Sequence, residues 1–210
     1  MQSYIVPAGY GEIEYIEKRS RFIGRVWHIG SESDALAHVK EMREKHWDAT
    51  HNVYAYSVKE GGIARFSDDG EPSGTSGMPV LNVFRSGGVD DFCCVVTRYF
   101  GGILLGAGGL VRAYSKSASM ALDAAGRAEL RVHSAVSVIC SYPQFTRLKS
   151  ELDRFGAALT STEYGADVDF TVSLPAQEAE RFILRVTELS AGTAIAGITG
   201  ESTVPVRMQP

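Results

Sequence analysis

The hydrophobic and polar residues of the first half of the chain alternate in a way that predicts a sheet combined with helices. Strand-like runs cover residues 12–17, 21–29, 51–58 and 63–66, and a short apolar run follows at residues 92–96. Helical spacing appears at residues 31–45, where Leu36, Val39 and Met42 share one face, and again at residues 110–125. Pro79 favours the first turn of a short helix that ends near residue 85 and is capped by Thr75 or Ser76.

After residue 126 the pattern changes to a β-α-β-β-α-β order. Strands are expected at residues 135–141, 158–164, 168–174 and 194–206, and helices at 144–155 and 176–189. This order predicts a ferredoxin-like domain, with residues 127–134 as a linker. The chain is therefore expected to be α+β, with an N-terminal domain over residues 1–130 and a C-terminal domain over residues 135–208.

Composition limits the classes of function. The chain has 210 residues, 44% of them hydrophobic and 22% charged, as is usual for a folded soluble protein. It has neither an apolar run long enough for a membrane span nor a signal-peptide pattern, so a cytoplasmic protein without a membrane partner is expected. Cys93, Cys94 and Cys140 are expected to be buried free thiols, the first two on opposite faces of a strand. The net charge of −4 argues against broad nucleic-acid binding but permits a local basic patch.

The junction between the strand at 92–96 and the helix at 110–125 is rich in glycine. Such a junction can direct backbone N–H groups and the positive end of a helix at an anion, and arginine adds planar forks of donors. The predicted anion- or ligand-binding set is Arg98, Tyr99, Gly101, Gly102, Gly106, Gly108, Gly109, Arg112 and Lys116. The known phosphate-loop fingerprints fail here, because Ala107 and Val111 stand where they require lysine and glycine. An equally open reading is that the glycines permit positive φ and tight packing while the arginines are solvated or paired with carboxylates.

An acidic loop supplies a second candidate. Asp68, Asp69 and Glu71 could hold a cation such as Mg²⁺ against a bound phosphate, or they could serve as ordinary turn and cap residues. His51 with Asn52 could act as an acid–base pair or as a surface or capping pair. No metal-ligand set, catalytic residue or cofactor is assigned.

Two long motifs resemble the YigZ/Impact family. They are residues 67–79, SDDGEPSGTSGMP, and residues 96–114, VTRYFGGILLGAGGLVRAY. The resemblance implies an N-terminal α/β sandwich like the second domain of a small-subunit ribosomal protein, followed by a ferredoxin-like domain similar to a late domain of elongation factor G. Small-molecule kinases share that N-terminal fold, and bacterial relatives are suggested to bind nucleic acid or the translation machinery.

The favoured hypothesis is an RNA- or ribosome-associated protein with a role in translation regulation. In this hypothesis Arg98, Arg112, Lys116 and the glycine backbone hold phosphates, and Tyr99 or Tyr114 can stack on bases. The first alternative is an enzyme or binder acting on a small phosphorylated ligand, with the acidic loop holding a cation. The second is a protein-interaction regulator that docks a translation-related protein.

Overall fold

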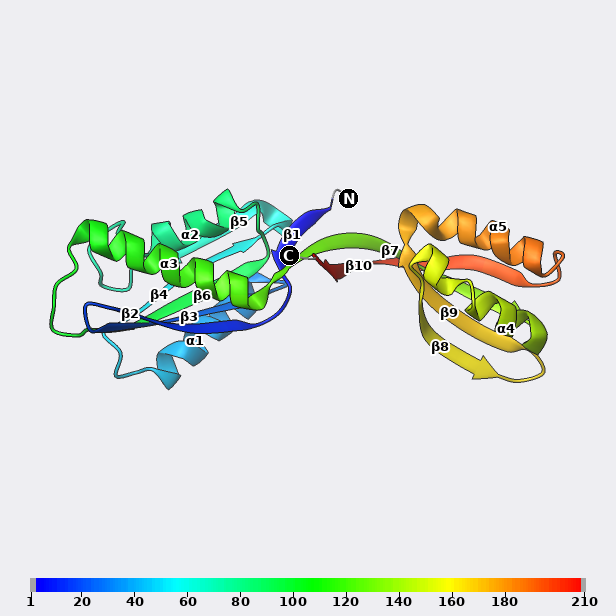
Figure 1. Ribbon diagram of the computed structural model, residues 1–210, viewed down its shortest axis with the longest axis horizontal. Coiled ribbons are helices and arrows are strands. Elements are labelled where there is room, and N and C mark those ends of the chain that lie inside the picture. Colours follow the sequence, from blue (N-terminus) through cyan, green and yellow to red (C-terminus); the bar gives the residue numbers. More distant parts are fainter. Residues whose placement is uncertain (1–2, 209–210) are drawn as a thin grey trace. The chain divides into compact units, whose positions relative to one another are not determined.

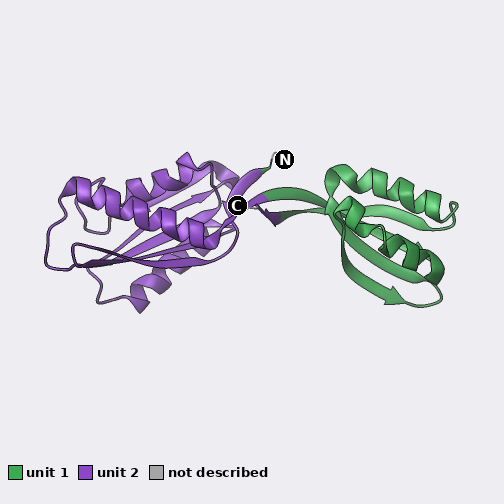
Figure 2. Ribbon diagram, in the orientation of Figure 1, with its two compact units in different colours: residues 1–3, 130–204 green, residues 4–129, 205–210 purple. Residues whose placement is uncertain are grey.

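A computed structural model describes residues 3–208 of the chain. The chain divides into two compact units, which are coloured separately in Figure 2. Unit 2 is formed mainly by Tyr4–Glu129 and unit 1 mainly by Leu130–Val204. Among residues 3–208, no helix is both long and apolar enough to cross a membrane.

Unit 2 is a five-stranded antiparallel sheet with helices on both faces (Figure 1). The strand order is β2-β3-β6-β4-β5. Strands β3 and β4 both pair antiparallel with β6, so they run parallel to each other and are joined across the sheet by helix α1. The elements are β1 (Tyr4–Pro7), β2 (Gly11–Glu17), β3 (Ser20–His28), α1 (Glu32–Lys45), β4 (His51–Val58), β5 (Ile63–Ser67), α2 (Gly77–Ser86), β6 (Phe92–Tyr99) and α3 (Ala107–Ala125).

Each face of this sheet has its own core. Helices α2 and α3 cover one face, and the core between them and the sheet includes Cys94. Helix α1 covers the other face, where the core includes Cys93. The prediction that the adjacent thiols point to opposite faces is confirmed, since successive strand residues alternate. The predicted inner face of α1 is partly wrong, because Ala35 is buried beside Val39 and Met42 while Leu36 is 51% exposed.

Unit 1 has the predicted ferredoxin-like β-α-β-β-α-β order, with β8, β9, β7 and β10 side by side in one sheet. The predicted linker at residues 127–134 is wrong, because these residues form the first half of one long strand; their alternating Ala-Glu-Leu-Arg-Val-His pattern fits that assignment. The helix predicted at residues 144–155 ends early and is followed by a short 3₁₀ turn at Leu152–Phe155. The elements are β7 (Arg127–Cys140), α4 (Tyr142–Lys149), β8 (Ala158–Tyr164), β9 (Val168–Pro175), α5 (Ala179–Leu189) and β10 (Ile195–Arg207).

Candidate functional site

Strand β6 carries Arg98 and Tyr99 to opposite faces of the sheet. The strand extends to Tyr99, three residues beyond the predicted end at residue 96, so the alternation of a strand applies to both side chains. Arg98 lies on the α3 side and is only 5% exposed. The Tyr99 hydroxyl lies on the α1 side, where it is 2.9 Å from His46 Nδ1 and donates to Asp48 Oδ1 at 3.1 Å. The structure therefore separates Tyr99 from the other residues predicted to hold a phosphate.

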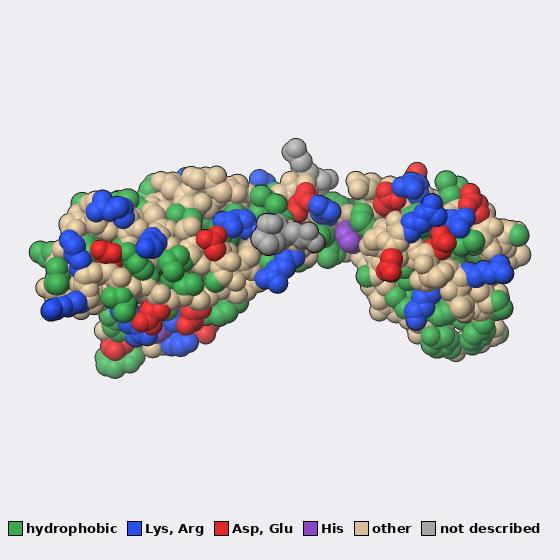
Figure 3. Space-filling model, viewed as in Figure 1, with side chains coloured by type: hydrophobic (Ala, Val, Ile, Leu, Met, Phe, Trp, Pro, Cys, Tyr) green, Lys and Arg blue, Asp and Glu red, His purple; other side chains and the backbone are tan. Residues whose placement is uncertain are grey.

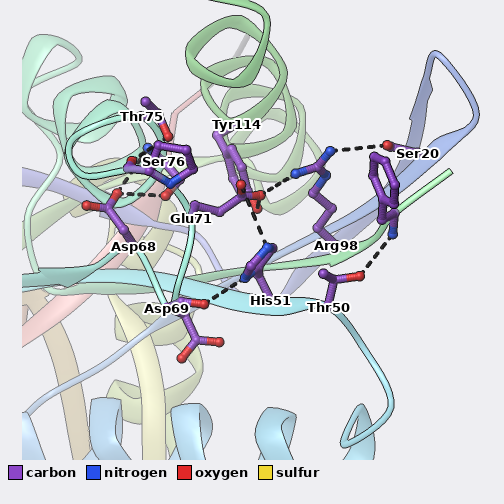
Figure 4. A network of polar contacts seen from close by, with 12 residues as sticks. Ser20, Thr50, His51, Asp68, Asp69, Glu71, Thr75, Ser76, Arg98 and Tyr114 are labelled. Carbon is purple, nitrogen blue, oxygen red and sulfur yellow. Dashed lines mark hydrogen bonds and ion pairs between the residues drawn. The ribbon is translucent and has the colours of Figure 1, made fainter. Parts of the chain in front are cut away.

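Arg98 forms a buried ion pair with the acidic loop (Figure 4). Its Nη1 lies 2.6 Å from Glu71 Oε1, and the two side chains are 6% and 3% exposed. The hydroxyl of Tyr114 donates to the same Glu71 oxygen at 2.7 Å. Burial, with the neighbouring Glu71 carboxylate, raises the pKa of Tyr114 well above its ordinary range, so this hydroxyl stays a donor. Arg98 is thus paired with a carboxylate, as the structural reading of the motif anticipated, and Tyr114, which is fully buried, cannot stack on a base.

His51 completes this polar cluster from the start of β4. Its Nδ1 is 2.7 Å from the backbone carbonyl of Asp69, which can only accept, so Nδ1 carries the proton. Its Nε2 is 3.8 Å from Glu71 Oε2, too far for a hydrogen bond. In the neutral ring, Nε2 is therefore an acceptor with unused capacity.

The three carboxylates of the acidic loop have separate roles. Asp68 Oδ1 accepts from the backbone N–H groups of Ser76 and Gly77 at the start of α2, and also from the Ser76 hydroxyl at 2.6 Å. Asp69 pairs with Arg43 at 2.8 Å. Glu71 is occupied by Arg98 as described above. Within residues 3–208, no group of three His, Cys, Asp or Glu side chains is arranged to hold a metal ion.

A pocket of about 370 Å³ lies above this cluster, within unit 2. Its polar lining comes from Thr50, His51, Glu71 and Arg98. The rest is mostly apolar and includes Phe100, Leu104, Leu105 and Leu110, together with Gly106 and Ala107 where α3 begins. The pocket therefore combines a few buried polar groups with apolar walls, the usual composition of a small-ligand site.

The glycine loop is held against the turn between β2 and β3. A side-chain carbon on Gly101 would lie 2.0 Å from the backbone carbon of Arg19, so only glycine allows this close approach. The loop ends at Gly106, which precedes α3 with a φ of 72° and leaves the first turn without a side-chain cap. Helix α3 begins at Ala107, three residues before the predicted start at residue 110, so Gly108 and Gly109 belong to its first turn.

A second hollow, of about 260 Å³, is lined by three exposed cationic side chains, and we call it the basic groove. Lys18 from the β2–β3 turn, together with Arg112 and Lys116 from α3, lines it beside Tyr15 and Glu17. Within residues 3–208, none of the three cations forms an ion pair with a carboxylate, and Lys116 Nζ lies 4.4 Å from the Tyr15 ring centroid. Glu17, whose carboxylate accepts a hydrogen bond from the Tyr15 hydroxyl, is the one acidic residue of this lining, so three cations against one carboxylate leave the groove positive.

The turn that supplies Lys18 has an unusual backbone. Lys18 and Arg19 have φ values of 45° and 67°, a left-handed conformation that two-residue hairpin turns usually assign to Asn and Gly. Such strain costs roughly 1–2 kcal/mol per residue and is commonly found at functional sites. Lys18 is absent from the predicted binding set, although a Lys-Arg pair between two predicted strands was the available signal.

The predicted binding set is therefore divided between two neighbouring hollows. Arg98 and Gly106 line the pocket, Gly109, Arg112 and Lys116 line the basic groove, and Leu105 lines both. Four members of the predicted set line neither of them: Tyr99, Gly101, Gly102 and Gly108.

The fold and these sites define a two-domain protein with an Impact-type N-terminal domain. The family model of the Impact N-terminal domain matches residues 18–122, and a domain of unknown function (DUF1949) matches residues 138–193. The chain belongs to the IMPACT family.

Related proteins match nearly the whole chain. It is 37% identical to the IMPACT family member YvyE of Bacillus subtilis over 91% of this chain and 89% of the relative. It is 34% identical to the IMPACT family member YigZ of Escherichia coli over 92% and 96% of the two chains. A crystal structure of a hypothetical protein, 33% identical, matches with a TM-score of 0.60 over 93% of this chain and 97% of that one. The two-domain α+β layout predicted from the sequence is thereby confirmed.

Proposed function

We propose that this protein is a cytoplasmic RNA- or ribosome-associated protein that acts in translation regulation and holds RNA phosphates in the basic groove. The observation that supports this most strongly is the convergence of Lys18, Arg112 and Lys116 without carboxylate partners in the described part of the chain. Figure 3 shows Lys and Arg side chains gathered on the part of unit 2 where α3 begins. Membership of the IMPACT family is consistent with a role in translation.

The charge distribution favours a small site. The whole chain carries −4, so phosphate contacts must be local, and the groove provides three cations. For single-stranded RNA, the slope of log affinity against log salt is about −0.7 per neutralised phosphate, which gives a slope of about −2 here. Arg98 is excluded from these contacts because its charge is already matched by Glu71.

The test is binding of the protein to fluorescein-labelled single-stranded RNA octamers, measured by anisotropy at several salt concentrations, beside co-sedimentation with ribosomal subunits. The variant Arg112→Ala/Lys116→Ala should lose most of the affinity and reduce the salt slope by roughly 1–2. The control Arg147→Ala/Lys149→Ala removes the same charge from exposed positions of α4 and should leave binding unchanged. Equal binding by the two variants would contradict the proposal.

A further inference from the structure

We propose that the pocket beside the basic groove takes one unpaired base of the bound RNA, so that phosphates lie in the groove and the base lies in the pocket. This inference rests on the proposed function, because it assigns the ligand of the adjoining pocket.

The polar groups of the pocket match the edge of a nucleobase better than they match a phosphate. His51 Nε2 is an acceptor with unused capacity, since its Nδ1 donates to the Asp69 carbonyl. Arg98 Nε is a buried donor that has no hydrogen-bond partner among the described residues. Nucleobases carry donors and acceptors side by side on their edges, and a site that reads them needs both.

The charge of the pocket also argues against a free phosphate. Glu71 and Arg98 neutralise each other at a distance of 2.6 Å, so the pocket holds no unmatched cation when His51 is neutral. The basic groove, in contrast, is lined by three cations and one carboxylate, so it keeps a net positive charge. A nucleotide would accordingly place its phosphate in the groove and its neutral base in the pocket.

The walls and the size of the pocket suit a single base. Phe100 and Leu104 line it and are 46% and 82% exposed, so their apolar surfaces are available to a ligand. Stacking of a base on an aromatic side chain is worth about 1–3 kcal/mol per base. A volume of 370 Å³ is near the small end of the range of roughly 300–1,000 Å³ that small-ligand pockets span, and it leaves no room for a duplex.

The two hollows are close enough to share one nucleotide or two successive ones. Leu105 is part of the lining of both. Ala107 in the first turn of α3 lines the pocket, and Gly109 in the same turn lines the groove. An RNA strand bound along the start of α3 would meet the cations on one side of Leu105 and the apolar walls on the other.

The test compares a uridine octamer and an adenosine octamer with an abasic ribose-phosphate octamer of the same length, by anisotropy. Ala107→Phe fills the pocket from an exposed position on α3, and Ala37→Phe makes the same change at an exposed position of α1 as a control. We expect the native protein and Ala37→Phe to bind at least one base-bearing octamer about 10-fold more tightly than the abasic one. Ala107→Phe should lose this difference while its salt slope stays unchanged.

Each other outcome has a definite meaning. Equal affinity of the native protein for base-bearing and abasic octamers would overturn the inference and leave the proposed function standing. The inference would also fail if Ala107→Phe kept the 10-fold preference, or if it weakened abasic and base-bearing octamers alike. Failure of the native protein to bind any octamer, or ribosomal subunits, would overturn both.

Discussion

The buried pair between Glu71 and Arg98 gives the most stringent test of the geometry of the site. Glu71→Gln keeps the size of the side chain and one oxygen for Tyr114, but removes the charge that matches Arg98. Both side chains are at least 94% buried, so the guanidinium left behind would be an uncompensated charge in a poorly hydrated place. Breaking a buried pair from one side typically costs about 3–5 kcal/mol.

The variants form a double-mutant cycle with a matched surface control. Glu71→Gln and Arg98→Met should each destabilise the protein by about 3 kcal/mol, which lowers the Tm by roughly 6–12 °C for a chain of this size. The double variant should cost less than the sum of the two, by about 1–3 kcal/mol of coupling. Glu14→Gln breaks the exposed pair with Arg21, whose N···O distance is 2.8 Å, and should leave the unfolding midpoint nearly unchanged, because water screens an exposed pair.

The assay is urea unfolding followed by circular dichroism, with the same slope fitted to all variants so that midpoints convert to free energies. Two results would refute the reasoning. One is a cost for Glu71→Gln as small as that of Glu14→Gln, which would mean that water reaches the pair. The other is strict additivity of Glu71→Gln and Arg98→Met, which would mean that the two charges do not interact.

Three further predictions follow from local contacts. Gly101→Ala places a carbon against the backbone of Arg19, so it should destabilise the protein by roughly 1–3 kcal/mol and weaken RNA binding. The carbon added by Gly108→Ala meets no contact closer than 3.5 Å. This variant should therefore stabilise α3 by about 0.5–1 kcal/mol in thermal melts. Burial opposes ionisation of Asp68, but hydrogen bonds to the start of α2 outweigh it and lower its pKa below the ordinary 3.8. Asp68→Asn should therefore cost about 1–2 kcal/mol in urea unfolding at pH 7. The difference should begin to shrink as the pH falls below 3.8 and should vanish once the pH passes the lower pKa of the folded state, where the native carboxylate is protonated. Burial and neighbouring cations lower the pKa of His46 below 6.5, so folding disfavours its protonation and stability is lost as the pH falls below 6.5. His46→Gln should therefore flatten the pH dependence of the unfolding midpoint between about pH 7.5 and 5.5. An unchanged pH dependence would contradict the assignment.

Much of the fold follows from local patterns in the sequence. Alternation in residues 168–174 and helical spacing in residues 110–125 matched the elements found there, because each side of those elements faces a different environment. Residues 51–58 also form the expected strand, although both of its faces are buried. The errors arose where a pattern was short or mixed. Residues 127–134 alternate too briefly to stand out, and only their continuation into β7 shows that they are one strand.

The site was harder to predict, because its members depend on which side of a strand each residue occupies. Arg98 and Tyr99 are adjacent in the sequence, and only the true end of β6 decides that they face different cores. His51 contacts Asp69 through a backbone carbonyl, a partner that carries no residue signature. Lys18 joins the groove through a hairpin turn whose left-handed backbone is not what a Lys-Arg pair favours.

The two motifs that carried the family resemblance meet in the ion pair between Glu71 and Arg98. The acidic motif supplies the Glu71 carboxylate. The glycine motif supplies the Arg98 guanidinium and the Tyr114 hydroxyl, which both donate to the same Glu71 oxygen. A buried ion pair is weak support for stability, because well-packed apolar residues of similar volume often serve as well or better. The same pair also lines a pocket whose wall includes the exposed side chain of Leu104. Exposing a large apolar side chain to water is unfavourable, and folding alone does not require it. The arrangement is explained more fully if the pair shapes a pocket for a neutral ligand while the unpaired cations of the groove hold its charge.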